Sequence, residues 1–430
     1  MKVSVLGIWH LGAVTSACLA DAGHVVVGVD EDSDIIGKLN SGTAPLFEPG
    51  LNDLIKRGIN SKNLSFKGVE KLSFIDSALV WVTYDTPVDD DDSANVDFVI
   101  EKIINILPFL SQGTVVLISS QLPVGSVARL EKYANDNYYS LHLKFACSPE
   151  NLRLGQAIRV FFDPDRVIIG IRSDAVKPLL LELFHDITDK IEWMSIESAE
   201  MTKHAINAFL ATSITFTNEL ATICECVGAN AKEVERGLKT EVRIGSNAYV
   251  SPGGPFGGGT LARDIGFLSI ISSDNGLITP VISSVRESNN EHKNWAQKKL
   301  KRHFVNLHNK VVAVWGLTYK PGTNTLRRSP AVELCNWILS EGGTINVFDP
   351  VVEELPRNWG NDALKYSSGK DAIKGADILV VGTEWPELKQ IALDITAVEI
   401  NNMLVIDPNG FLKNFLADKA MKYYVVGEIL

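Results

Sequence analysis

Gly7, Gly12 and Asp30 are the residues whose types and spacing indicate a chemistry most directly. Gly7 follows a short apolar run, a helical pattern begins near Gly12, and Asp30 ends the next apolar run, at 24–29. This is the order of a dinucleotide-binding unit, which consists of a strand, a glycine turn, a helix and a second strand, followed by an acid about 20 residues past the glycines. An acid at this place favours NAD over NADP, because a 2′-phosphate would be repelled.

One position departs from the dinucleotide fingerprint. G-x-G-x-x-G requires glycine at position 9, where this chain has Trp9. The middle glycine lets the backbone approach the pyrophosphate, so a side chain as large as Trp9 must point away. The alternative is a plain βαβ unit in which Asp30 is only a turn residue.

A second stretch that could approach a ligand runs from Ser251 to Asp264. Five of the seven residues from Gly253 to Gly259 are glycine, and prolines stiffen the same run. Glycine and proline disfavour helix and strand, so this stretch is expected to be a loop that leads into a helix at 260–271. The structural alternative is a surface turn in which Thr260 caps the helix and Asp264 is its first-turn acid.

Polar residues also follow several apolar, strand-like runs in the first half of the chain. Thr86, Gln121 and Glu150 come after the runs at 78–83, 114–119 and 143–147. Ligands bind beyond the carboxyl ends of parallel strands, which predicts that the three residues line one crevice. The alternative for Glu150 is a solvated surface charge.

The second half begins with one long helical stretch, at 198–226. Lys203 and Asn207 are four residues apart in this helical stretch and therefore lie on one face of it. The two residues could belong to a functional site or to an exposed polar stripe. New βα units start near Lys310, where Lys320 and Arg327 could hold a phosphate or be ordinary surface cations.

These patterns predict an α/β protein with two doubly wound, Rossmann-like domains joined by a long central helix and a small helical dimerisation domain. The expected domains are an NAD-binding domain at 1–195, a central helical domain carrying the glycine-rich loop at 196–300, and a second α/β domain at 301–430.

The composition narrows the function classes. A net charge of −11 opposes binding to nucleic acid through a basic surface. No apolar run is long enough to span a membrane, and the five cysteines form no metal-type cluster, so a cytoplasmic protein without a metal is expected.

Taken in order, the motifs of nearly the whole chain resemble those of the UDP-glucose/GDP-mannose dehydrogenase family. The matching segments are 47–51, 148–150, 164–167, 200–207, 218–219, 243–245, 251–264, 320–321 and 327–330. The resemblance implies NAD-linked oxidation of the primary alcohol of a nucleotide sugar, a UDP-sugar above all, to a carboxylate in two steps. It also implies that the domain at 301–430 binds the UDP part of the nucleotide sugar, that the protein is a homodimer, and that it has a role in polysaccharide biosynthesis.

The resemblance also implies roles for individual residues. Lys203 and Asn207 would polarise the oxygen on the reacting carbon, Asp264 would accept the alcohol proton through water, and Glu150 would serve the second step. The remaining cofactor contacts would be Thr86, Gln121, Arg263 and Arg327 beside Gly7, Gly12 and Asp30. Substrate contacts would be Glu150, Leu152, Lys203, Asn207, Arg243, Tyr249, Gly253, Gly257 and Lys320.

The departures from the family pattern are chemical. Thr260 stands where the family has the cysteine that forms a thiohemiacetal and then a thioester. Gln121 replaces a threonine, Leu154 a glutamate, Arg263 a lysine, and residues 324–325 an acidic pair. A hydroxyl needs a strong local base to match a thiolate as a nucleophile, so the second oxidation is the step in question.

Three interpretations follow. The enzyme could stop at a two-electron product, an aldehyde or ketone. It could complete the four-electron oxidation to the uronic acid through a hydrated aldehyde. It could also be a silent relative that binds NAD and a nucleotide sugar. Trp9 and Thr260 favour the third interpretation, and the retained Lys203, Asn207 and Asp264 favour the first.

Overall fold

The computed structural model describes all residues except 90–93, 151, 258, 421 and 429–430. The chain forms two compact units, Met1–Ala205 and Ile206–Leu430.

The first unit is built on an eight-stranded sheet in the order β3-β2-β1-β4-β5-β6-β7-β8. Every described pair is parallel except β6 with β7. The strands are β1 (Lys2–Leu6), β2 (Val25–Asp30), β3 (Leu64–Gly68), β4 (Leu79–Val82), β5 (Val115–Ile118), β6 (Lys144–Cys147), β7 (Val167–Ile171) and β8 (Ile191–Met194). The strand order reverses between β1 and β4, and ligands bind at such a switch point in doubly wound sheets.

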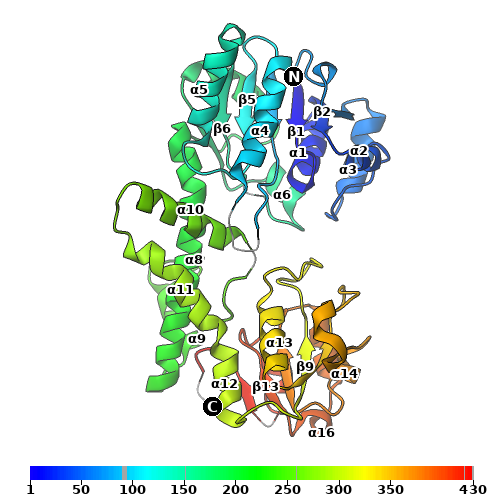
Figure 1. The fold of residues 1–430 in the computed structure, drawn as a ribbon, viewed down its shortest axis with the longest axis vertical. Helices are drawn as coiled ribbons and strands as arrows, with labels where there is room; N and C mark the ends of the chain where they lie inside the picture. The colour runs from blue at the N-terminus through cyan, green and yellow to red at the C-terminus, as the bar shows by residue number, and fades with distance from the viewer. Residues whose placement is uncertain (90–93, 151, 258, 421, 429–430) are drawn as a thin grey trace. The chain divides into compact units, whose positions relative to one another are not determined.

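Helices cover both faces of this sheet (Figure 1). Val3 and Val5 of β1 pack in one core cluster and Leu6 in the other, because alternate residues of a strand face opposite sides. The helices are α1 (His10–Asp21), α2 (Ser33–Asn40), α3 (Leu51–Asn60), α4 (Val96–Ile106), α5 (Ser126–Tyr138), α6 (Ala157–Phe162) and α7 (Lys177–Phe184).

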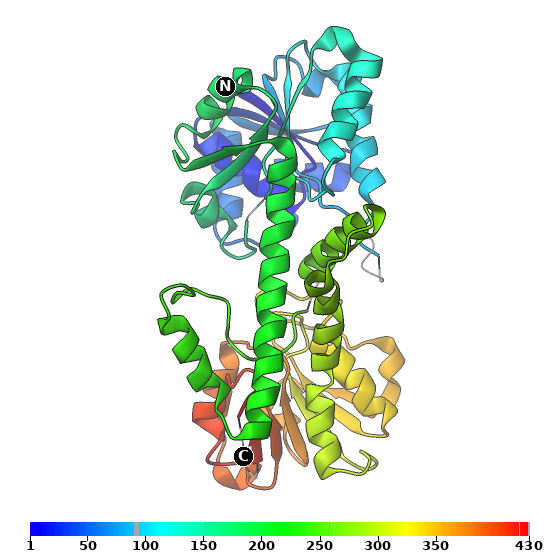
Figure 2. The same ribbon diagram turned by 90° about the vertical axis from the view of Figure 1, so that its left-hand side faces the viewer.

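The predicted long helix is α8 (Ile196–Val227), and Figure 2 shows it unbroken. Its first turns are fixed to the first unit. The Glu200 carboxylate accepts the N–H groups of Gly125 (2.7 Å) and Val127 (3.0 Å) at the start of α5. His204 Nε2 donates to the Leu122 carbonyl oxygen at 3.0 Å.

The second unit holds the rest of α8, a helical layer and a six-stranded sheet in the order β11-β10-β9-β12-β13-β14, in which every pair is parallel. Its strands are β9 (Val311–Trp315), β10 (Thr344–Phe348), β11 (Ala363–Lys365), β12 (Ile378–Val381), β13 (Leu404–Ile406) and β14 (Lys422–Tyr424). The helices are α9 (Ala231–Thr240), α10 (Thr260–Asp274), α11 (Pro280–Lys293), α12 (Trp295–His303), α13 (Pro330–Ser340), α14 (Gly369–Ala372), α15 (Glu387–Asp394), α16 (Ala397–Ile400) and α17 (Lys413–Leu416).

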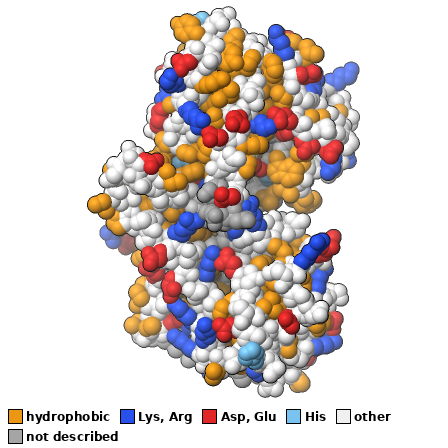
Figure 3. Space-filling view, viewed as in Figure 1, with side chains coloured by type: hydrophobic (Ala, Val, Ile, Leu, Met, Phe, Trp, Pro, Cys, Tyr) orange, Lys and Arg blue, Asp and Glu red, His pale blue; other side chains and the backbone are white. Residues whose placement is uncertain are grey.

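The predicted fold class is therefore confirmed, with two Rossmann-like parallel sheets and a long central helix. The division into three domains at 195 and 300 stays a prediction. On the face drawn in Figure 3, lysines and arginines are interspersed with acidic side chains. Across the described residues, no helix combines the length and the apolar character that crossing a membrane requires.

Candidate active site

The turn between β1 and α1 has the geometry of a dinucleotide cradle. Gly7 has a φ of +89°, which favours glycine, and a Cβ at Gly12 would stand 1.9 Å from the Gly7 carbonyl oxygen. The same carbonyl oxygen accepts a hydrogen bond from Thr83 Oγ1 at 2.7 Å. Both glycines are thus required for the tight turn that precedes α1.

Asp30 lies at the end of β2 beside this turn. Its Oδ2 accepts the Ile8 N–H at 2.9 Å, and its Oδ1 accepts the Glu31 N–H at 2.8 Å. Asp30 stays partly exposed. Its Oδ1 also accepts the Asp32 N–H at 3.1 Å, whereas Oδ2 accepts the Ile8 N–H and has a second lone pair. A ribose hydroxyl can therefore still be bound by this acid, as NAD requires.

Trp9 is the residue at the N-cap of α1, and its side chain is 42% exposed. Its neighbour His10 contacts Glu48 at 3.1 Å (Nε2 to Oε2). Glu48 is buried and also accepts the N–H groups of Gly155 (2.7 Å) and Ala157 (2.8 Å). The carboxylate of Glu48 thus ties the start of α1 to the segment that precedes α6.

Two predicted cofactor residues come together at the ends of β4 and β5. Thr86 Oγ1 donates to the Gln121 carbonyl oxygen at 2.6 Å, and Thr86 is buried. Next to Gln121, the buried Ser120 Oγ has no hydrogen-bond partner among the described residues. An orphaned buried hydroxyl at this strand end fits a polar group of a bound cofactor. Ser120 did not stand out in the sequence, where its signal is a serine pair that ends an apolar strand.

The second sheet has the same kind of glycine turn followed by an acid, but this acid is buried and fully bonded. Gly316 has a φ of +84°, and Asp349, after β10, is buried. Asp349 Oδ2 accepts the Leu317 N–H (2.7 Å) and Trp385 Nε1–H (3.1 Å), and Oδ1 accepts the Val351 N–H (3.0 Å). The carboxylate oxygens of Asp349 are therefore occupied and shielded from solvent. Of the two sheets, only the first has an acid and a glycine turn that fit NAD.

Two matched amide substitutions should distinguish the role of Asp30 in NAD binding from the structural role of Asp349. Asp30→Asn should raise the Kd for NAD about tenfold or more, because a hydrogen bond to a charged group contributes about 1.5–3 kcal/mol. Asp349→Asn should leave that Kd unchanged and lower the free energy of unfolding by about 2 kcal/mol, since an amide has one acceptor oxygen. Calorimetric titration with NAD and urea unfolding measure the two quantities, and equal loss of NAD binding in both variants would refute the assignment.

The predicted catalytic residues of the first unit are Lys203 and Glu150, and they are in contact. Lys203 Nζ donates to the Glu150 carbonyl oxygen at 2.8 Å and lies 3.5 Å from its carboxylate Oε1. Glu150 Oε2 accepts the Leu152 N–H at 2.9 Å. The Lys203 side chain is only 15% exposed, so its position is well defined by this pair.

In the second unit, Asn207 and Asp264 are brought together. Asn207 Nδ2 donates to Asp264 Oδ2, and Asp264 is fully buried although it carries a carboxylate. Buried acids are rare unless they have partners or a function. Lys203 and Asn207 are one turn apart on α8 and so project from one face of that helix.

The alternative in which Thr260 caps the next helix is wrong. Gly259 is the N-cap, Thr260 is the first residue of α10, and no side chain of the described residues caps the helix. A Cβ at Gly259 would lie 2.2 Å from Arg328 Nη1, so a larger residue at the cap would displace the end of the Arg328 side chain. Asp264 lies beyond the first turn and faces Asn207, which also excludes its role as a first-turn acid.

The other predicted contact residues are placed without being brought into one cluster. Arg243 is exposed and bonds to Glu241 (Nε to Oε1, 2.8 Å), and Tyr249 is exposed as well. Lys320 Nζ lies 5.4 Å from the centre of the Tyr319 ring. Arg263 is the residue before Asp264 on α10, and Arg327 lies between β9 and α13.

Two glycines of the loop are required by packing. A Cβ at Gly253 would lie 2.1 Å from Asn409 Oδ1, and one at Gly257 would lie 2.9 Å from Pro330 Cδ. Gly253 and Gly257 therefore let the loop approach the edge of the second sheet.

No described cysteine combines an ionisable thiol with a place beside the Asn207–Asp264 pair. Burial raises the pKa of the Cys18, Cys147 and Cys335 thiols well above the usual range, so they stay protonated. Cys224 is buried, and the exposed Cys226 lies about 28 Å along α8 from Asn207.

The fold and the first cradle define an NAD-binding dehydrogenase of the α/β class. Three models of the UDP-glucose/GDP-mannose dehydrogenase family match the chain: the NAD-binding domain at 1–188, the central domain at 197–291 and the UDP-binding domain at 313–414. The chain belongs to this family. The prediction of an NAD-dependent nucleotide-sugar dehydrogenase is thereby confirmed at the level of the family.

Individual relatives agree over their full length. The chain is 31% identical over 438 residues to the UDP-glucose 6-dehydrogenase of Rhizobium meliloti (strain 1021), and both chains are fully covered. It is 29% identical over 433 residues to that of Rickettsia conorii (strain ATCC VR-613 / Malish 7), again with full coverage. The structure of a UDP-glucose dehydrogenase from Pyrobaculum islandicum superposes with a TM-score of 0.85 at 25% identity, covering 99% of this chain and 97% of that one.

Proposed function

We propose that this chain oxidises a nucleotide sugar, a UDP-sugar above all, with NAD and stops after one hydride transfer. The observation that carries the proposal is the buried Asn207–Asp264 pair, with Thr260 at the start of α10 in the same unit. Lys203 precedes Asn207 by four residues on α8. By family resemblance, Lys203 and the Asn207–Asp264 pair serve the first oxidation and Thr260 stands at the position of the nucleophilic cysteine.

The first oxidation needs a base and a site for a developing alkoxide. The Lys203 ammonium and one N–H of the Asn207 amide would stabilise the negative charge on the alcohol oxygen. The second N–H of that amide is held by Asp264, which orients the group. Asp264 would take the hydroxyl proton through a water molecule. When bound, NAD supplies the acceptor for the hydride that leaves the same carbon, so that a C=O bond forms.

The second oxidation needs a nucleophile that turns the aldehyde into an adduct able to lose another hydride. Thr260 is exposed on the first turn of α10, and no base among the described residues bonds to its hydroxyl. An unactivated hydroxyl is far less ionised at neutral pH than a thiol, and the cysteines of the chain are buried or distant. The first product, an aldehyde or a ketone, would therefore be released.

A panel of UDP-, GDP- and dTDP-sugars tests this function directly. With NAD in excess, at least one sugar should give NADH, because the groups for the first hydride transfer are retained. An absence of NADH with every sugar, from a folded protein that still binds NAD, would reject enzymatic function and favour a silent binding protein.

We also propose a homodimer formed through α8. Phe209, Phe216, Ile223 and Val227 are 55–71% exposed at spacings of seven and four residues, so they form one apolar stripe. Exposed apolar stripes of this kind mark interaction surfaces. Sedimentation at micromolar concentration should give the mass of two chains, and the mass of a single chain would contradict the dimer.

A further inference from the structure

We propose that His292 and Asn218 are positioning residues that hold the glycine-rich loop and thereby place the start of α10. The inference rests on the proposed function for its effect on catalysis, but the loop contacts themselves lie wholly within the second unit. His292 comes from α11 and Asn218 from α8.

The two side chains bind adjacent peptide groups of the loop. Asn218 Oδ1 accepts the Gly253 N–H at 3.0 Å, and Asn218 Nδ2 donates to the Gly254 carbonyl oxygen at 3.3 Å. His292 Nε2 donates to the Gly253 carbonyl oxygen at 2.7 Å. Asn218 and His292 are buried, so water competes little for these hydrogen bonds.

The described backbone groups of residues 253–256 need side chains as hydrogen-bond partners, because they belong to no strand or helix. Asn409 Oδ1 accepts the Gly254 N–H at 2.7 Å, and Asn289 bonds to both the N–H (2.9 Å) and the carbonyl oxygen (3.1 Å) of Phe256. Together with the bonds from α8 and α11, every N–H and C=O of Gly253, Gly254 and Phe256 is bonded to a side chain. Buried backbone groups without such partners would destabilise this conformation.

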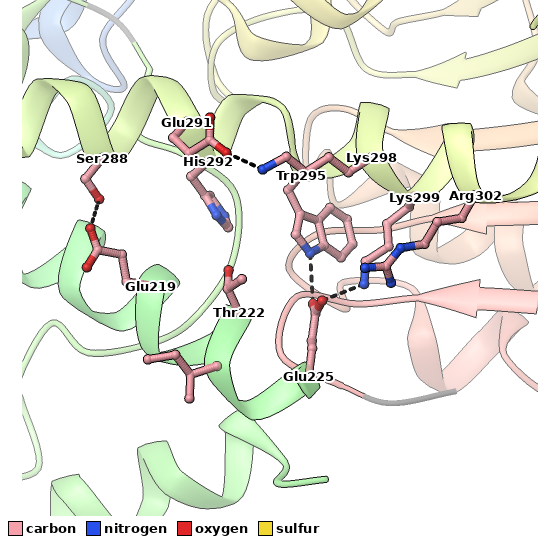
Figure 4. A pocket seen from close by; sticks show the side chains of 11 residues that line it. Glu219, Thr222, Glu225, Ser288, Glu291, His292, Trp295, Lys298, Lys299 and Arg302 are labelled. Carbon is pink, nitrogen blue, oxygen red and sulfur yellow. Dashed lines mark hydrogen bonds and ion pairs between the residues drawn. The ribbon is translucent and has the colours of Figure 1, made fainter. Parts of the chain in front are cut away.

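His292 is well suited to hold a carbonyl oxygen in place. Burial lowers the pKa of its imidazole, although the Gly253 carbonyl raises it, so the ring is neutral near pH 7 and carries the Nε2 proton as a donor. The ring lies in the wall of a pocket of about 370 Å³ between α8 and α11–α12, with Thr222 and Trp295 (Figure 4). On the other side, His292 and Gly254 line a cavity of about 150 Å³.

A shift of residues 253–256 would be transmitted along a short path. Six residues after Gly254, Thr260 begins α10, which carries Asp264 on its second turn. A displacement of about 1 Å at a catalytic group can cost a large factor in rate. His292 and Asn218 are therefore expected to affect turnover without touching the substrate.

Hydrogen–deuterium exchange of a peptide covering 250–257 tests the inference without any substrate. In His292→Leu, exchange of the Gly253, Gly254 and Phe256 amides should rise about tenfold, because the loop loses a buried hydrogen bond. His292→Gln should stay near the wild type, since the glutamine amide can donate to the same carbonyl. Asn218→Asp, which keeps the acceptor and loses the donor, should also raise exchange. Ser284→Ala, two turns earlier on α11, should not, because the Ser284 hydroxyl bonds back to the Val281 carbonyl oxygen of the same helix at 3.1 Å.

Turnover adds a second readout, with UDP-glucose as the probe. His292→Leu should lower kcat about tenfold and leave the KM for NAD unchanged, because the NAD cradle lies in the first unit. Wild-type exchange in both His292→Leu and Asn218→Asp would overturn the inference. Failure of the wild type to oxidise UDP-glucose would count against the proposed function only. The exchange result would still decide the role of His292.

Discussion

Lys203→Ala should lower kcat about a thousandfold while the Kd for NAD stays within about twofold of the wild type. Loss of one preorganised group that stabilises a developing oxyanion typically costs about 10²–10³ in kcat. Lys203 also contributes a full charge in a poorly solvated place, since its side chain is only 15% exposed. The cradle of Gly7 and Asp30 is made by other elements, so binding of NAD should not change.

Thr202→Ala is the matched control for this substitution. Thr202 precedes Lys203 on α8, and its hydroxyl bonds back to the Ser198 carbonyl oxygen at 2.7 Å and lies 3.6 Å from Met194 Sδ, so it contacts neither Lys203 nor Glu150. Its removal tests whether any disturbance of this turn of α8 slows the enzyme. Single-turnover kinetics with NAD in excess give the rate. A loss below about tenfold in Lys203→Ala would remove Lys203 from the catalytic groups.

In the Thr260→Cys variant, a fraction of the product should be the acid instead of the aldehyde. For that fraction, the yield should rise from one to two NADH per sugar. The first turn of α10 presents unpaired N–H groups and the positive end of the helix dipole, which lower a thiol pKa. The thiolate would add to the aldehyde as a thiohemiacetal, lose a hydride to give a thioester, and be released by hydrolysis.

Thr260→Ser is the control, because it keeps a hydroxyl and should still give one NADH. Intact-protein mass spectrometry of Thr260→Cys should show the thioester, since by the family resemblance Gln121 replaces a threonine that helps to position water, and its absence should slow hydrolysis. If neither adduct nor acid forms in the cysteine variant, Thr260 is not the sole reason for the early stop.

Much of the fold could be predicted, because buried parallel strands are continuous apolar runs. The apolar runs at 78–83, 114–119 and 143–147 form β4, β5 and β6, each within one residue of the predicted bounds. The edge strands β3 and β14 were not predicted. Their sequences, LSFKG and KYY, mix polar and apolar residues because an edge strand is only half covered.

The candidate site was predictable only where local spacing carries the information. The shared face of Lys203 and Asn207 follows from helical geometry alone. The bonds from His292 and Asn218 to the loop join residues 39, 35 and 36 positions apart, so no local pattern reveals them. Threonine is favoured at helix caps, which made a capping Thr260 the structural alternative, but α10 already begins at Thr260 with Gly259 at the cap.

Counting NADH formed per nucleotide sugar consumed, with the product identified by mass, tests the central claim most directly. The sugar that is active in the panel is converted completely by the wild-type protein with NAD in excess. One NADH per sugar and a product two mass units lighter than the substrate are predicted, as expected for loss of two hydrogens. Two NADH per sugar and a uronic acid would contradict the account and show that Thr260 does not prevent the second oxidation.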